Sequence, residues 1–151
     1  MKKKGIGTGW IWLLFLVYLG FLLYFLFLSE HFGRTERVEG FQYNLQPFQE
    51  IGRYFRHRNA LPQLFLINIV GNIGAFLPFG LLLPSLLPKR MRRLLVVFCL
   101  TYLFSLSVEC VQMLTHVGIF DLDDIILNTL GGVLGYLCYI VLRKAGLFSG
   151  G

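Results

Sequence analysis

Four long apolar stretches divide the sequence, and the charged residues gather between them. They cover about residues 10–28, 61–87, 94–114 and 125–142, and Glu109 alone interrupts the third. A bilayer core of ~30 Å needs about 20 helical residues, so each stretch is long enough to span a membrane. Backbone groups must be paired in lipid, and the runs lack two-residue alternation, so we expect helices. The pattern predicts an all-α, polytopic membrane protein with four transmembrane helices.

Composition agrees with this pattern. Hydrophobic residues make up 56% of the 151 residues and the mean hydropathy is +0.66, more than a soluble domain of this length carries. We expect one membrane domain over residues 1–151, with an outer loop at 29–60. The first apolar stretch is too long for a signal peptide and no small-residue cleavage site follows it, so we interpret it as an uncleaved span.

The distribution of basic residues predicts the orientation. Short loops rich in Lys and Arg stay in the cytoplasm. With four spans, nine basic residues share one side and five the other; the nine are Lys2, Lys3, Lys4, Lys89, Arg90, Arg92, Arg93, Arg143 and Lys144. Both termini are therefore expected in the cytoplasm. The loop at 29–60 and the short loop at 115–123 are expected on the outer face.

Polar residues recur on one face of each of the last three spans, at about 100° per residue. The third span carries a stripe of Thr101, Ser105, Glu109, Gln112 and His116. The fourth carries Asp121, Asp124, Asn128, Gly131, Gly132 and Gly135, and the second carries Asn68, Asn72 and Ala75 with Gly71 beside them. With the expected orientation, the amides and carboxylates lie at one level near the outer face.

The simplest packing turns these stripes toward one outward-facing polar pocket, since polar groups in a membrane turn inward to partners or water. We expect seven residues to line it: Asn68, Asn72, Glu109, Gln112, Asp121, Asp124 and Asn128. Hydrogen bonds between helices are an alternative for the amides, and close helix packing is the favoured explanation for the glycines.

Glu109 is the candidate for a functional or catalytic side chain. Packing alone seldom requires an ionisable group within a span. Burial raises a carboxyl pKa and a nearby guanidinium lowers it, so Glu109 is either a neutral donor or half of an ion pair. The sequence leaves both alternatives open.

The outer loop contains "RYFRHR", which mixes aromatic and basic side chains as membrane-interface segments do. Arg53, Arg56 and Arg58 are either simple membrane anchors or ligands for the phosphates of a lipid or lipid-linked precursor, which suits the bidentate geometry of arginine. Arg34 and Arg37, also in this loop, are further candidates for binding a headgroup.

No metal site, cofactor or nucleic-acid partner is expected. Glu109, His116 and the aspartates at 121–124 offer oxygen-rich ligands, but their spacing matches no known metal-binding loop. Aspartates at the start of a helix are ordinary N-terminal residues that cap it and complement its dipole.

Four segments in order resemble the VanZ-like family of bacterial membrane proteins: "NLQPF" (44–48), "NIVGNIGAFLPFG" (68–80), "SVECVQ" (107–112) and "FDLDDIILNTLGGVLGY" (120–136). The resemblance covers most of residues 34–136. It implies a multi-pass protein of the bacterial plasma membrane that lowers susceptibility to glycopeptides such as teicoplanin. Many members have an arginine in the turn before the aspartates; this chain does not, so the expected partner of Glu109 shifts to Arg34 or Arg37.

Three hypotheses for the function follow. The first is a protein without enzyme activity that binds an amphiphile in the outward pocket, such as a lipid-linked cell-wall precursor or the glycopeptide itself. The second is an enzyme acting on a lipid or precursor headgroup, with Glu109 as acid or base; the absence of a recognised nucleophile and base pair makes it the weaker alternative. The third is a transporter or flippase component, which would require a homo-oligomer because four spans are few for a carrier.

Overall fold

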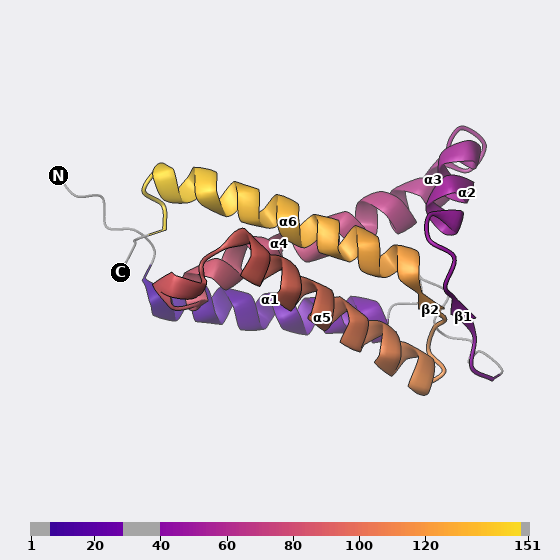
Figure 1. Ribbon diagram of the computed structural model, residues 1–151, viewed down its shortest axis with the longest axis horizontal. Helices are drawn as coiled ribbons and strands as arrows, with labels where there is room; N and C mark the ends of the chain where they lie inside the picture. The colour runs from indigo at the N-terminus through magenta and orange to yellow at the C-terminus, as the bar shows by residue number, and fades with distance from the viewer. Residues whose placement is uncertain (1–6, 29–39, 149–151) are drawn as a thin grey trace.

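The computed structural model describes residues 7–28 and 40–148. Four helices in it are long and apolar enough to cross a membrane, which confirms the predicted all-α polytopic fold (Figure 1). They are α1 (Thr8–Leu28), the helical stretch Pro62–Leu86, α5 (Leu94–Leu114) and α6 (Leu122–Lys144). Their ends lie within three residues of the limits expected from the apolar runs. The cytoplasmic placement of the termini stays a prediction.

The second span is three helical segments in succession. A short α3 (Pro62–Phe65) leads into a π-helical turn, η2 (Leu66–Val70), and then into α4 (Gly71–Leu86). Pro62 lies in the first turn of α3, where the backbone nitrogen has no hydrogen-bond partner within the helix, so its missing N–H costs nothing. Within α4, Pro78 and Pro84 each remove one backbone donor. The apolar pattern of the sequence does not predict the π-helical turn.

The closest packing in the bundle is between α4 and α6, and it depends on glycines. A Cβ atom added at Gly80 would lie 1.8 Å from the carbonyl oxygen of Gly132. Added at Gly135, it would lie 2.0 Å from the carbonyl oxygen of Leu77. No side chain fits in either gap, so these glycines let the two backbones touch, as the expected small-residue spacing suggested.

The two ends of the bundle differ in structure. At one end, η3 (Lys89–Met91) joins α4 to α5, and Arg143 and Lys144 lie in the last turn of α6. We call this the basic end. At the other, β1 (Tyr43–Asn44) pairs in parallel with β2 (Phe120–Asp121), and α2 (Gln49–His57) lies beside the start of α6 (Figure 1). We call this the α2 end.

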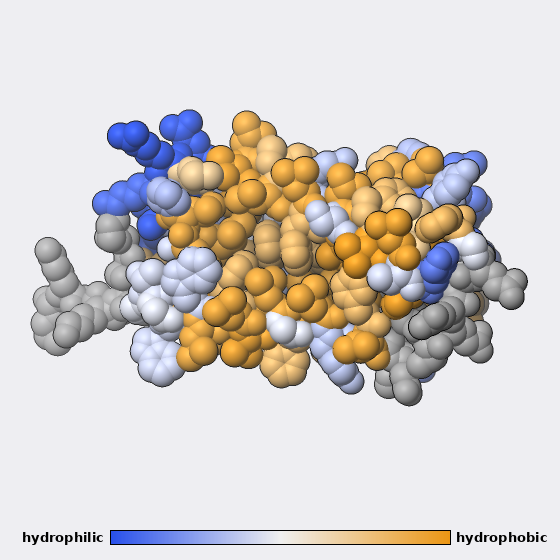
Figure 2. Space-filling view, turned by 90° about the horizontal axis from the view of Figure 1, so that it is seen from below, coloured by the Kyte–Doolittle hydropathy of each residue, from blue (hydrophilic) through white to orange (hydrophobic). Residues whose placement is uncertain are grey.

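Apolar side chains cover the bundle between these ends, as Figure 2 shows for one face. Large hydrophobic residues on α1 are mostly exposed, among them Trp10 and Phe21. Such a surface is suited to lipid contact rather than water. Helix α1 is attached by polar contacts as well: the hydroxyl of Tyr18 donates to the carbonyl oxygen of Ala75 at 2.7 Å, and Gln112 Nε2 donates to that of Leu26 at 2.8 Å.

Candidate functional site

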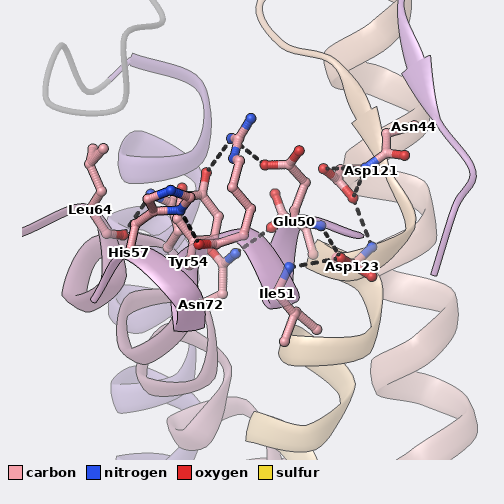
Figure 3. Close-up of polar contacts among 12 residues, drawn as sticks. Asn44, Glu50, Ile51, Tyr54, His57, Leu64, Asn72, Asp121 and Asp123 are labelled. Atoms are coloured by element: carbon pink, nitrogen blue, oxygen red, sulfur yellow. Dashed lines mark hydrogen bonds and ion pairs between the residues drawn. The ribbon is translucent and has the colours of Figure 1, made fainter. Parts of the chain in front are cut away.

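Three aspartates at the start of α6 each bind a different part of the α2 end. Asp121, Asp123 and Asp124 form this set, which we call the aspartate cluster. Figure 3 shows two of them, Asp121 and Asp123, between α6, the strand β1 and the first turn of α2. The cluster joins β1, α2 and α4 to the start of α6.

Asp123 caps α2 from across the molecule. Its carboxylate accepts hydrogen bonds from the backbone nitrogens of Phe48 at 2.6 Å, Glu50 at 2.9 Å and Ile51 at 3.0 Å. The first turn of a helix has unpaired N–H groups and the positive end of the helix dipole, so a carboxylate stabilises it there. Asp123 itself is 1% exposed, whereas the residues that donate to it are partly or fully exposed. It stood outside the predicted pocket, because nothing in the local sequence indicates partners more than 70 residues away.

Asp121 joins the turn after α5 to β1 and to α6. Its Oδ1 accepts from the backbone nitrogen of Asp123 at 2.8 Å, which makes it the N-cap of α6. Its Oδ2 accepts from Asn44 Nδ2 at 3.4 Å, across the β1/β2 pairing. Burial raises the pKa of Asp121 above its ordinary value, opposed by the hydrogen bonds from Asp123 and Asn44.

Asp124 and Glu109 are each paired with a predicted pocket residue. Asn72 Nδ2 donates to Asp124 Oδ1 at 2.6 Å, which links α4 to α6. Glu109 Oε2 accepts from the backbone nitrogen of Asp121 at 3.0 Å. Glu109 is 3% exposed, so its carboxylate is inside the bundle and not in lipid. It supports the turn that carries the aspartate cluster.

The other predicted pocket residues are in separate contacts. Gln112 is buried and holds α1 through Leu26, as described above. Asn128 is also buried, and its Nδ2 donates to Ser105 Oγ at 3.0 Å between α6 and α5. Asn68 is partly exposed and donates to the carbonyl oxygen of Leu64 in its own helix. Most of the seven side chains therefore form hydrogen bonds to a different helix or strand, whereas Asn68 bonds within its own helical span.

The arginines of α2 are at the surface. Arg53 forms an ion pair with Glu50, and its Nη2 donates a hydrogen bond to the Tyr54 hydroxyl at 3.4 Å. Its side chain is 55% exposed. Arg56 and Arg58 are exposed and bond to backbone carbonyls of their own segment. Burial raises the pKa of Glu50, and the charge of Arg53 partly offsets this. The other two candidates, Arg34 and Arg37, lie outside the described residues.

A groove of about 350 Å³ separates α1 from α4 in the half of the bundle nearer the α2 end. Its α1 wall carries large side chains, including Phe21 and Phe25, whereas its α4 wall carries Gly71 and Gly74. Of the seven predicted pocket residues, Asn72 alone is part of its lining. This size is within the range of ligand sites, ~300–1,000 Å³.

Within the described ranges, no group of three or more His, Cys, Asp or Glu side chains is placed to hold a metal ion. The aspartates instead have their oxygens turned to backbone amides and asparagine side chains. The arrangement can fix the position of α2 and of the groove wall relative to α6.

Comparisons with known proteins agree with the resemblance seen in the sequence. The family model described as VanZ/LLP1 matches residues 15–143. A similar curated protein is "Protein VanZ" of Enterococcus faecium, which is 33% identical over 107 residues. That alignment covers 67% of this chain and 54% of the relative, so the chain spans about half the length of the curated relative it matches. No solved structure matches the chain. This chain belongs to the VanZ/LLP1 family of membrane proteins.

Proposed function

We propose that the protein lowers the susceptibility of a bacterial cell envelope to lipoglycopeptides such as teicoplanin by binding an amphiphile at its α2 end. The family and the similarity to "Protein VanZ" support a role in the envelope. The amphiphile is a lipid or lipid-linked precursor with a phosphate-bearing headgroup, or the glycopeptide itself. The plasma membrane, with the α2 end on its outer face, is the proposed location.

The observation that carries the proposal is the capping of α2 by Asp123. Three hydrogen bonds to the buried Asp123 carboxylate fix the helix, and two of its arginines are left exposed with Arg58 just beyond its end. Exposed aromatic residues nearby, such as Phe48 and Phe55, are suited to the headgroup layer of a bilayer. Guanidinium groups at that level can bind phosphate oxygens in a bidentate manner.

The outward polar pocket expected from the sequence is replaced in this proposal by a surface. The aspartate cluster and Glu109 hold the elements together, and the arginines of α2 contact the headgroup. Glu109 is deeply buried and bound to the backbone of Asp121, which favours a structural role over acid–base catalysis at an open surface. The enzyme and transporter hypotheses gain no specific support from these contacts.

A binding experiment with two triple variants tests the proposal. Replacing Arg53, Arg56 and Arg58 with Gln should weaken binding of the purified protein to a fluorescent phosphatidylglycerol probe in micelles at least fivefold. Replacing the same three residues with Lys keeps the charge but removes the bidentate geometry, so this matched control should show a smaller loss. In cells, the Gln variant should lose teicoplanin resistance and keep vancomycin susceptibility unchanged. Unaltered lipid binding and full resistance in the Gln variant would refute the proposal.

A further inference from the structure

We infer that the α1/α4 groove holds one acyl chain of the amphiphile bound at the α2 end, and that this chain enters sideways from the membrane. The inference rests on the proposed function and adds the class of ligand: a lipid with a flexible hydrocarbon tail.

The lining is almost wholly apolar. On α1 it is formed by aromatic and leucine side chains such as Phe21, Leu22 and Phe25. On α4 it is formed by the small residues Gly71, Gly74 and Ala75, together with Asn72 and Pro78. Large groups on one wall face small groups on the other, which leaves a hollow that only apolar atoms fill favourably.

The surroundings of the groove favour a hydrocarbon chain. The groove lies between α1 and α4, which are joined by the Tyr18–Ala75 hydrogen bond, and its volume is about 350 Å³. A flexible acyl chain can adapt to a hollow of this size, and the exposed apolar side chains of α1 beside it are suited to lipid contact.

The groove is connected to the α2 end through its one amide side chain. Asn72 is part of the lining, and its Nδ2 donates to Asp124. Asp124 follows Asp123, whose carboxylate caps α2 (Figure 3). The wall of the groove and the helix that carries the arginines are thus positioned by consecutive residues of α6. One ligand can therefore place its acyl chain in the groove and its headgroup at α2.

A larger side chain at Gly74 would fill the groove. Gly74 lines the groove, and a Cβ atom added there meets nothing within 4 Å. Leucine at this position would occupy the space proposed for the chain without striking the rest of the bundle, and it would favour the helix. Gly20 on α1 is the matched control, because it is equally free of neighbours and is not part of this groove.

The test uses vesicles of phosphatidylethanolamine and phosphatidylglycerol that contain a trace of phosphatidylglycerol with a diazirine in its acyl chain. After irradiation, mass spectrometry locates the cross-links. In the wild type they should concentrate on residues 18–26 and 71–78. Gly74→Leu should reduce them at least fivefold, Gly74→Ala should reduce them less, and Gly20→Leu should leave them within twofold of wild type.

Two outcomes would overturn the inference: cross-links spread evenly around α1 in the wild type, or wild-type labelling of the groove in a Gly74→Leu protein that elutes and melts like the wild type. Neither outcome would refute the proposed function, which is tested separately by lipid binding to the Arg53, Arg56 and Arg58 variants. Loss of groove labelling in Gly74→Leu with unchanged teicoplanin resistance would confirm the acyl-chain site and contradict its link to resistance.

Discussion

The carboxylate of Asp123 lies 2.9 Å from the backbone nitrogen of Glu50, 73 residues earlier in the chain. It therefore caps a helix that it does not belong to. Side-chain caps are ordinarily local, within the first turn of their own helix. Here the first turn of α2 takes its cap from α6, so the surface helix depends on the membrane bundle for this contact.

Removing the cap should release α2. In Asp123→Ala the amides of Phe48, Glu50 and Ile51 lose their acceptor, at a cost of about 0.5–2 kcal/mol for a cap. Hydrogen–deuterium exchange of residues 50–57 in nanodiscs should become faster, with little change in α5. Asp123→Asn keeps one acceptor oxygen and should have a smaller effect. Equal exchange in Asp123→Ala and wild type would show that the cap does not hold the helix.

Substitution of the contact glycines should destabilise the bundle. Gly135→Ala places a methyl group against the Leu77 carbonyl, so α4 and α6 must separate, at a cost of about 1–3 kcal/mol. Thermal unfolding in detergent should occur at a lower temperature. Gly20→Ala has no neighbour to displace and should melt at or above the wild-type temperature. Two identical melting curves would contradict the close packing.

Mild acid should stabilise the α2 end through Asp121. Burial raises its folded pKa above 3.8, so the folded protein keeps a proton that the unfolded chain has lost. This contribution to the free energy of unfolding is complete below pH 3.8 and disappears as the pH rises through the folded pKa. Asp121→Asn should flatten this part of the pH dependence, measured by unfolding at several pH values. A carboxyl pKa below 3.8 for Asp121 by NMR would reverse the sign.

Glu109 should stabilise the protein through its contact with the Asp121 backbone. Glu109→Ala leaves the partly buried amide of Asp121 without this acceptor and should cost about 1–3 kcal/mol in the free energy of unfolding. Glu109→Gln keeps a carbonyl oxygen that can accept from this amide, so it should cost less, insert like wild type and keep teicoplanin resistance. Loss of resistance in an inserted and stable Glu109→Gln protein would contradict a purely structural role for this residue.

Labelling with a membrane-impermeant maleimide would test the orientation. In a chain without Cys99, Cys110 and Cys138, Arg56→Cys should react in intact cells because α2 is expected outside. Lys89→Cys should react only after lysis, because the basic end is expected in the cytoplasm. The reverse pattern would place the arginines of α2 on the cytoplasmic face and remove the proposed outer binding surface.

The helices and one buried face could be predicted because their signals are local. Apolar runs of sufficient length locate the spans, and helical spacing places Thr101, Ser105, Glu109 and Gln112 on one stripe of α5, all of them buried. His116, the fifth residue of the predicted stripe, lies beyond the end of α5 and is only partly buried. The loop expected at 29–60 contains β1 and α2, which were missed. A two-residue strand and a helix of nine residues are too short to be stable without tertiary contacts.

The sequence by itself determined that the chain has four helices long and apolar enough to cross a membrane, because length and hydropathy alone decide which segments lipid can accommodate. Only the tertiary structure decided how the polar residues are used. Hydrogen bonds depend on distances of about 3 Å, which spacing along one helix cannot specify between helices. The fold therefore decides that Asp123 accepts hydrogen bonds from α2, that Asn72 donates to Asp124, and that Glu109 accepts from the backbone of Asp121.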